Sequence, residues 1–369
     1  QPLLIKVSRR KGVILMKSWK MALVTTLLAG AAMNAWAANP AMYVTDPAQQ
    51  RSIDSIENLD NGRFYMMDYS ADYKLDTLLD QSVGDIEGML RFIQTDLLLQ
   101  GEVKKGNIDG ACSAFAGRTE EGKPIYGRNF DYKMDMTAVL VRTAPRNGYR
   151  SIGMADAGWI GYGLGSLDDG KTDVSAAVGM PYLIMDGLNE KGLAVSVLKL
   201  DGAPTRQNTG KKKITTTAAL RLMLDKAADV EEALALLRQY DMQSSMDNAN
   251  FHFLLSDASG RNVVLEYTIN TMTVLDANYV ANHYLAPKMK GLGHAYDRFA
   301  VLAAAMKFKK NVLSPNEAMS LLELVSQPET EEATSMTQWS VVYNLEDLTA
   351  RVAIRRNYDK FFDFHLNRY

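Results

Sequence analysis

The spacing of apolar residues changes in character after the first third of the chain. Residues 38–110 are mostly polar and rich in turn residues, except for the run DIEGMLRFIQTDLLL (85–99), where apolar residues recur at the three- and four-residue spacing of a helix. Beyond Cys112, short apolar runs bounded by Asn, Asp and Gly are typical of strands. The pattern predicts a mostly helical, loosely organised segment over 38–111, followed by a strand-rich region.

The strand-rich region combines paired strands with helical blocks. CSAFAGRT (112–119) and KPIYGRNF (123–130) flank the turn EEG and predict a hairpin. Further strands are predicted at 136–145, 192–200, 251–257, 262–269, 271–277, 340–347 and 350–356. Helical spacing covers 215–227, 230–240, 296–308 and 314–326, the last with a capping box at its start. Strand pairs grouped around helices favour an α+β fold of antiparallel sheets covered by helices, in one domain from 112 to 369.

The composition is that of a folded protein with a large core. The 369 residues are 47% hydrophobic and 23% charged, and 41 Lys and Arg against 43 Asp and Glu leave a net charge of -2. This balance gives no indication of a nucleic-acid partner or of a membrane-coating face.

The N-terminal residues have the pattern of a secretory signal peptide. From Met16 the chain reads MKSWKMALVTTLLAGAAMNAWAANP, with two lysines, an apolar run and then Ala35-Trp36-Ala37. A membrane anchor is the alternative, but the apolar run of about 16 residues is short of the roughly 20 that a span needs. We expect residues 1–37 to be an N-terminal extension and signal peptide that starts at Met16. The mature protein would then be exported, periplasmic or extracellular, and without a membrane span.

Cys112 is the only cysteine, so it cannot form a disulfide within the chain. It is either a buried small apolar residue or a reactive group. The chain has no G-x-S-x-G or H-E-x-x-H motif, and its four histidines are scattered without ligand spacing. GWIGYGLGSLDDG (158–170) lacks the spacing of a dinucleotide loop. A Cys–His protease needs its thiol near the start of a helix, whereas Cys112 begins a predicted strand. No metal or cofactor is predicted.

One chemistry needs no histidine. If the bond before Cys112 is cut, the freed α-amine can act as the base for its own thiol. An α-amine titrates at about 7.7–8.0 and a thiol at about 8.5, so the two groups are matched near neutral pH. Residues 38–111 would then be a propeptide, and NIDGA (107–111) would lead up to the bond that is cut.

Several motifs resemble one enzyme family. Arg128 and Asp131 follow Cys112 by sixteen and nineteen residues in an R-N-x-D motif, and the closing segment reads TQWSVVYNLEDLTARVAIRRNYD. The remaining motifs are NEKGL (189–193), Asn282 in VLDANYVANHYLAP and Arg298 in YDRFAVL. The pattern from Cys112 to the end resembles the N-terminal nucleophile hydrolases that cleave linear amides. That group includes choloylglycine (bile salt) hydrolases and penicillin V acylases, and more distantly acid ceramidase-like and isopenicillin N acyltransferase-like enzymes.

The resemblance implies a four-layer αββα sandwich of two antiparallel sheets covered by helices. It also implies autoproteolysis between Ala111 and Cys112, after which the thiol attacks an amide carbonyl to form a thioester. Asp131 would hold the new ammonium group, and the charge of Arg128 would lower the thiol pKa.

The resemblance assigns three more site residues. The main-chain N–H or the carboxamide of Asn189, and the carboxamide of Asn282, would donate to the oxyanion, and Arg298 would complete the charge network. The upstream segment is longer than in the bile salt hydrolases and is more like that of the acyltransferase and ceramidase branches. The substrate therefore stays open among conjugated bile acids, N-acyl amino acids or ethanolamides, acyl-homoserine lactones and penicillin V. An acyltransferase and a non-catalytic secreted binding module are the alternatives, and a retained propeptide chain or a homo-oligomer are further candidates for partners.

Overall fold

The computed structural model describes residues 39–98, 103, 110–133, 135–328 and 336–367. All of them belong to one unit, Trp36–Tyr369. The predicted signal peptide lies outside the described residues, as does most of the NIDGA stretch. No helix within the described ranges is both long and apolar enough to span a membrane.

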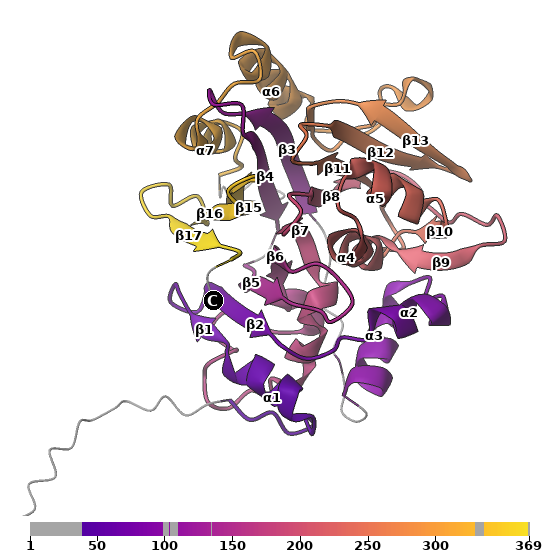
Figure 1. The fold of residues 1–369 in the computed structure, drawn as a ribbon, viewed down its shortest axis with the longest axis vertical. Coiled ribbons are helices and arrows are strands. Elements are labelled where there is room, and N and C mark those ends of the chain that lie inside the picture. Colours follow the sequence, from indigo (N-terminus) through magenta and orange to yellow (C-terminus); the bar gives the residue numbers. More distant parts are fainter. Residues whose placement is uncertain (1–38, 99–102, 104–109, 134, 329–335, 368–369) are drawn as a thin grey trace, which may run out of the picture. The chain divides into compact units, whose positions relative to one another are not determined.

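A six-stranded antiparallel sheet carries the predicted hairpin (Figure 1). Its strands, in spatial order, are β14 (Tyr279–Val280), β3 (Gly110–Arg118), β4 (Pro124–Tyr132), β15 (Met336–Asn344), β16 (Thr349–Ile354) and β17 (Phe362–His365). The hairpin of β3 and β4 is confirmed, but β3 begins two residues before Cys112. The nucleophile candidate therefore lies inside a strand of the uncut chain, with Gly110 and Ala111 also paired to β4.

A nine-stranded sheet forms the second β layer. Its strands, in spatial order, are β1 (Glu57–Asn58), β2 (Phe64–Tyr69), β5 (Ala138–Thr143), β6 (Ser151–Asp156), β7 (Ile184–Asn189), β8 (Ala194–Leu200), β11 (Asn250–Ser256), β12 (Asn262–Thr268) and β13 (Thr271–Asp276). Every neighbouring pair is antiparallel except β2 and β5, which are parallel. Two short parallel strands, β9 (Lys212–Thr215) and β10 (Tyr240–Gln243), pair separately.

Helices cover the outer faces of both sheets, and the sheets meet where β3 contacts β8 and β11. On the six-stranded sheet, α6 (Tyr296–Phe308) packs against β3 and β14, and α7 (Pro315–Leu324) packs against β4 and β15. On the nine-stranded sheet, α4 (Thr216–Lys226) packs against β7 and β8 and is flanked by α5 (Val230–Leu237). The four helices and the αββα layering are confirmed, and α7 begins with the predicted capping box of Ser314 and Glu317.

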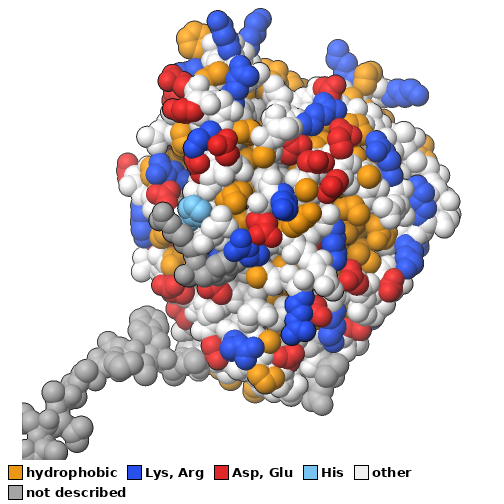
Figure 2. Space-filling view, viewed as in Figure 1, with side chains coloured by type: hydrophobic (Ala, Val, Ile, Leu, Met, Phe, Trp, Pro, Cys, Tyr) orange, Lys and Arg blue, Asp and Glu red, His pale blue; other side chains and the backbone are white. Residues whose placement is uncertain are grey.

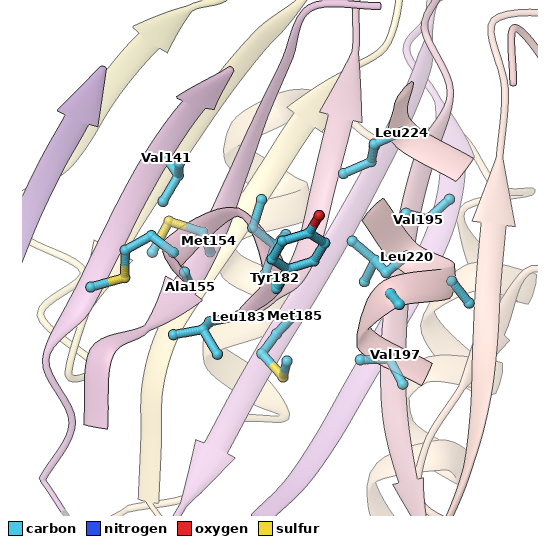
Figure 3. Packing of buried hydrophobic residues seen from close by; sticks show 14 of the residues in the cluster. Val141, Met154, Ala155, Tyr182, Leu183, Met185, Val195, Val197, Leu220 and Leu224 are labelled. Atoms are coloured by element: carbon cyan, nitrogen blue, oxygen red, sulfur yellow. The ribbon is translucent and has the colours of Figure 1, made fainter. Parts of the chain in front are cut away.

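The core under α4 shows why these segments pack as they do. Alternate residues of neighbouring strands point to one face, and α4 presents leucines at four-residue spacing to the same space. Figure 3 shows Tyr182 among side chains of strands β5 to β8 and of α4. The labelled neighbours, all buried, are Val141, Met154, Ala155, Leu183, Met185, Val195, Val197, Leu220 and Leu224. Each such aliphatic side chain contributes about 1.5–3 kcal/mol by leaving water.

The segment before Cys112 is more ordered than its sequence predicts. It contains α1 (Pro47–Asp54), α2 (Leu75–Gln81) and α3 (Ile86–Phe92), which continues into a π turn, η1 (Ile93–Leu97). It also supplies β1 and β2 to the nine-stranded sheet, and Phe64, Tyr65 and Met67 of β2 are fully buried. The expectation of a loosely organised segment is therefore wrong, because its apolar side chains are part of the main core. Helices do outweigh strands in its described part.

Candidate active site

The β3–β4 hairpin places the predicted residues on two faces of one sheet. Cys112 is paired with Phe130 and Ala114 with Arg128, so Cys112 and Arg128 share the face that meets the other sheet. Ala111 is paired with Asp131, whose side chain points to the opposite face. Cys112 is 3% exposed, and Arg128 and Asp131 are fully buried.

Arg128 lies directly against the thiol. Its Nη2 donates to the Cys112 sulfur at 3.2 Å and to the Val197 carbonyl oxygen at 2.6 Å. Its Nη1 donates to Asp186 Oδ2 at 3.0 Å, which forms a buried ion pair. The guanidinium is therefore held between the thiol and a carboxylate.

Asp186 is a site residue that the sequence did not single out. Its carboxylate also accepts hydrogen bonds from Trp339 Nε1 at 3.0 Å and from the Tyr343 hydroxyl at 2.7 Å. Burial raises the pKa of Asp186, and the Arg128 charge and the two hydrogen bonds oppose this rise. Asp186 lies three residues before the NEKGL motif, but its partner is on the other sheet, so only the tertiary structure reveals the pair.

Asn282 joins the nucleophile to the charges on the helix-covered face. Its Oδ1 accepts from the Cys112 backbone N–H at 2.8 Å and from Arg298 Nη2 at 2.9 Å. Its Nδ2 donates to the Lys199 carbonyl oxygen at 2.8 Å. Arg298, near the start of α6, donates through Nη1 to Asp131 Oδ2 at 2.7 Å. One hydrogen-bonded chain thus runs from the Cys112 nitrogen to Asp131.

Two further side chains fix the Asp131 carboxylate. Thr337 Oγ1 donates to Oδ1 at 2.6 Å, and Gln327 Nε2 donates to Oδ2 at 2.8 Å. Thr337 is paired with Asp131 across β4 and β15, and its hydroxyl also accepts from the Gln327 N–H at 2.8 Å. Thr337 belongs to the closing TQWSVVYN segment, but the sequence alone gave its hydroxyl no role.

The surroundings of the Cys112 thiol together shift its pKa in the opposite direction to Arg128 alone. Burial raises the pKa of Cys112, and Asp131 raises it further. Arg128, Arg298 and a hydrogen bond from the Lys199 N–H all lower it. Arg128 acts in the predicted direction, yet in the uncut chain the thiol pKa is raised because burial is the largest effect.

Comparison with known proteins agrees with this geometry. Residues 112–286 match the sequence profile of the linear amide C–N hydrolases, choloylglycine hydrolase family. Over this stretch, which is just under half of the chain, the sequence is similar to that family. The matched segment begins at Cys112 and includes Arg128, Asp131 and Asn282.

Two curated relatives align with part of the chain. Bile salt hydrolase/transferase of Clostridium perfringens is 25% identical over 183 residues, which cover 45% of this chain and 51% of the relative. Penicillin V acylase of Pectobacterium atrosepticum is 27% identical over 255 residues, which cover 60% of this chain and 65% of the relative. The chain therefore spans between one half and two thirds of the length of these relatives.

A solved structure shares the fold of the domain. A variant of conjugated bile acid hydrolase from Clostridium perfringens superposes with a TM-score of 0.52 at 20% identity. The superposition covers 69% of this chain and 92% of that one. The layered sandwich is thus the fold of that hydrolase.

The structure places Asn189 away from the nucleophile. Its Nδ2 donates to the carbonyl oxygens of Leu224 and Ala227 at 3.1 and 2.7 Å, beside the end of α4. Its Oδ1 accepts from the N–H groups of Lys191 and Leu193, both at 3.0 Å. These four bonds use the full capacity of the carboxamide for donors and acceptors.

Distance also separates Asn189 from the oxyanion site. Leu193, its hydrogen-bond partner, precedes the site residue Val197 by four positions, which is roughly 13 Å along a strand. The structure therefore does not bring Asn189 together with the other five predicted residues. Its place is in the turn between β7 and β8 and under the end of α4.

A small apolar cavity of about 20 Å³ adjoins the thiol. That volume is room for about one water molecule. Its wall is formed by Gly110, Cys112, Phe130, Tyr132, Trp159, Met185, Val197, Lys199, Met246 and Phe251. Because Gly110 precedes the predicted cleavage point, part of the wall belongs to the segment that cleavage would separate. Among the described residues, no three His, Cys, Asp or Glu side chains are grouped to hold a metal ion.

Proposed function

We propose that this protein is an exported cysteine amidase that hydrolyses N-acyl amides through a thioester on Cys112. The observation that carries the proposal is the contact of the only thiol with a fully buried, carboxylate-paired arginine, in a segment whose sequence is similar to a family of linear amide hydrolases. A fixed positive charge beside a sulfur favours the thiolate as nucleophile. Export rests on the signal-peptide pattern of residues 16–37.

The first reaction of the protein would be on itself. The Cys112 sulfur attacks the Ala111 carbonyl carbon, the C–N bond breaks, and the thiol proton passes to the Cys112 nitrogen. Water then hydrolyses the thioester, which releases the Ala111 carboxylate and restores the thiol beside a free α-amine. Asn282 already binds that nitrogen at 2.8 Å, which supports its role in holding the new amine.

In turnover the α-amine would accept the thiol proton and later protonate the leaving amine. Asp131 is paired with Ala111, so departure of Ala111 opens the space beside its carboxylate to the new ammonium group. Asn282 Nδ2 donates to the Lys199 carbonyl oxygen at 2.8 Å, and the Lys199 N–H donates to the sulfur. These two groups would donate to the oxyanion of the tetrahedral intermediate. Loss of one such donor costs about 3 kcal/mol in other enzymes.

An acyltransferase is the second candidate, in which an amine takes the place of water in opening the thioester. It is favoured by one observation, the name of the Clostridium perfringens relative, a bile salt hydrolase/transferase. The two functions use the same acyl-enzyme and differ only in the acceptor.

Mass spectrometry of the purified protein tests the proposal. We expect wild type to be cut between Ala111 and Cys112, and Cys112→Ala to stay uncut at this bond. Processed wild type should release free acid from at least one member of a panel of conjugated bile acids, N-acyl amino acids, N-acyl ethanolamides, acyl-homoserine lactones and penicillin V. An active preparation with an uncut chain would refute the mechanism. Correctly cut protein that turns over none of these amides would favour the binding module instead.

The fragment 38–111 should stay bound after the cut. β2 is paired along its length with β5, and its buried aromatic residues are part of the core. We therefore expect both chains to co-elute in native gel filtration and to separate only in denaturant. Loss of the fragment under native conditions would contradict this expectation.

A further inference from the structure

Helix α6 is apolar on its outer side as well as on the side that meets the sheet. Leu302 and Met306 are buried in the core of the six-stranded sheet, as expected of a covering helix. The other side of the helix faces outward from this sheet (Figure 1). A surface helix of a globular protein usually has a polar outer face. Here, most of the residues exposed on the outer face are apolar: Tyr296, Asp297, Ala300, Val301, Ala304, Lys307 and Phe308.

The apolar side chains of this face are strongly exposed. Phe308 is 84% exposed, and Tyr296 is 45% exposed. A groove of about 390 Å³ lies beside them between α6 and α7, and its wall includes Val301 and Leu324, which is 68% exposed. Exposed apolar patches of this kind mark surfaces that another surface covers.

Two charges lie at opposite ends of the same face. Asp297 is in the first turn of α6 and Lys307 is in the last, about 15 Å apart at 1.5 Å per residue. Neither has an ion-pair partner within the part of the chain that the structure describes. Both are five residues from Leu302, which is also the midpoint of the helix. The face is therefore arranged symmetrically about its centre, with opposite charges at its two ends.

We propose that α6 pairs antiparallel with α6 of a second copy of this chain, about a two-fold axis at Leu302. Such an axis places the first turn of each helix opposite the last turn of the other, so each contact occurs twice. Asp297 of each copy then comes within side-chain reach of Lys307 of the other. A parallel pair would instead set Asp297 against Asp297 and Lys307 against Lys307, so charge complementarity selects the antiparallel direction.

The apolar residues fit the same arrangement. Ala300 and Ala304 are equally far from the axis on either side, and their small side chains let two helices approach to about 8 Å. Tyr296 and Phe308 occupy the two ends, so Phe308 of each copy lies over the first turn of the other helix. The groove between α6 and α7 adjoins that turn and can take an aromatic ring. A contact of this kind closes with two copies and buries the outer face of both helices.

Sedimentation of the purified protein over a range of concentrations tests the pairing. The contact lies within residues 296–308, so it does not depend on whether the chain is cut before Cys112. We expect wild type to form a dimer with a Kd of about 1–100 µM, because one pair of helices makes a small interface. Wild type that stays monomeric up to the highest of these concentrations would overturn the inference.

Exchange of the two charges assigns the dimer to this face. Asp297→Lys and Lys307→Asp each place like charges together at two positions, so each should raise the Kd about tenfold or more. The double variant restores opposite charges, and its Kd should return to within about threefold of wild type. Lys171→Asp, which reverses an exposed lysine in the loop between β6 and β7, is the control and should leave the Kd unchanged.

The double variant also separates the pairing from the effect of each charge on its own helix. An acidic residue in the first turn and a basic residue in the last both favour the dipole of the helix that carries them. If that were their whole role, the exchange would lower the stability of each copy further and would not restore any association. A double variant that fails to recover the dimer, or single reversals that leave the Kd unchanged, would overturn the inference. Phe308→Ser changes a side chain that is 84% exposed, so it should keep the fold, and a Kd that does not rise in this variant would also count against the pairing.

Discussion

Replacing Asp186 by Asn should expose how much the site depends on its buried ion pair. The change keeps the size of the side chain, but it replaces one acceptor oxygen by an amide donor and removes the negative charge bound to Arg128 at 3.0 Å. Both side chains are fully buried, so the guanidinium loses its counter-charge where water cannot replace it. Breaking such a pair costs about 3–5 kcal/mol of unfolding free energy.

The size of the unit converts this cost into a melting shift. The unit Trp36–Tyr369 has an unfolding entropy of about 0.7 kcal/mol/K, at about 2.1 cal/mol/K per residue. The expected fall in Tm is therefore about 4–7 °C, measured by circular dichroism at neutral pH. Asp347→Asn is the matched control, because Asp347 pairs with Lys123 at the surface, and it should change Tm little.

The same variant should change the thiol. With Asp186 neutral, Cys112 becomes the anion nearest to Arg128, so the thiol pKa should fall below its wild-type value. Because the pKa of the Cys112 thiol is raised in folded wild type, the unfolding free energy falls as pH rises through that pKa. A lower thiol pKa in the variant makes this fall smaller. The stability difference should therefore be largest at neutral pH and smaller at alkaline pH.

Alkylation of the single cysteine by iodoacetamide, followed over pH, reports the thiol pKa in both proteins. If Asp186→Asn lowers the unfolding free energy by less than about 1 kcal/mol, then Asp186 is not needed to compensate the buried charge of Arg128. A thiol pKa above that of wild type would refute the electrostatic reasoning outright.

Three other changes test separate parts of the structure. Burial raises the pKa of Asp156 to about 8, so the unfolding free energy of wild type should fall by about 1.4 kcal/mol per pH unit between about pH 4 and 8. Asp156→Asn should not show this fall, and parallel curves of unfolding free energy against pH, from denaturant unfolding of the two proteins, would contradict the prediction. Asn189→Ala should lower the unfolding free energy by about 3 kcal/mol because it leaves buried backbone groups unpaired, whereas kcat of the processed enzyme should stay within a few-fold of wild type. A hundredfold loss of kcat at unchanged stability would instead indicate that Asn189 takes part in oxyanion binding. Thr337→Val removes a 2.6 Å hydrogen bond to Asp131, so kcat should fall about tenfold and its dependence on pH should shift. An unchanged pH profile of kcat would show that this hydrogen bond has no effect on the groups that titrate during turnover.

The local part of the site could be predicted because it lies on one hairpin. Cys112, Arg128 and Asp131 are separated by short distances along two strands joined by a tight turn, so their spacing in sequence fixes their register. Arg298 and Asn282 are farther away in sequence, and only the family resemblance indicated them. The contacts that make them useful, from Arg298 to both Asn282 and Asp131, depend on how α6 is placed over β3.

The features that sequence reasoning missed or placed differently depend on contacts between distant parts of the chain. Asn189 has the motif of a site residue, but the fold turns its carboxamide toward the end of α4. Strand β2 was missed because its pairing is parallel and its partner, β5, follows about 70 residues later in the chain, so no local turn indicates it. Asp186 was missed because an isolated carboxylate in sequence gives no sign of a partner on another sheet.

The division of the site between two faces bears on how the proton can move. Arg128 acts on the sulfur from between the sheets, whereas Asp131 and Arg298 lie on the face covered by helices. The Cys112 nitrogen belongs to the strand that separates the two faces, and through Asn282 it is already connected to the charges on the helical side.

A side-chain base would have to reach the thiol. Within the described chain, His252 contacts Glu266, His283 stacks on Tyr296, His294 contacts Asp201 and His365 accepts from the Asn367 N–H, and none of these four histidines lines the cavity at the thiol. A free amine on the nucleophile itself needs no such space, because it is one residue's own backbone and lies on the boundary between the two faces. The geometry therefore favours a proton carrier that self-cleavage creates over any that the uncut chain contains.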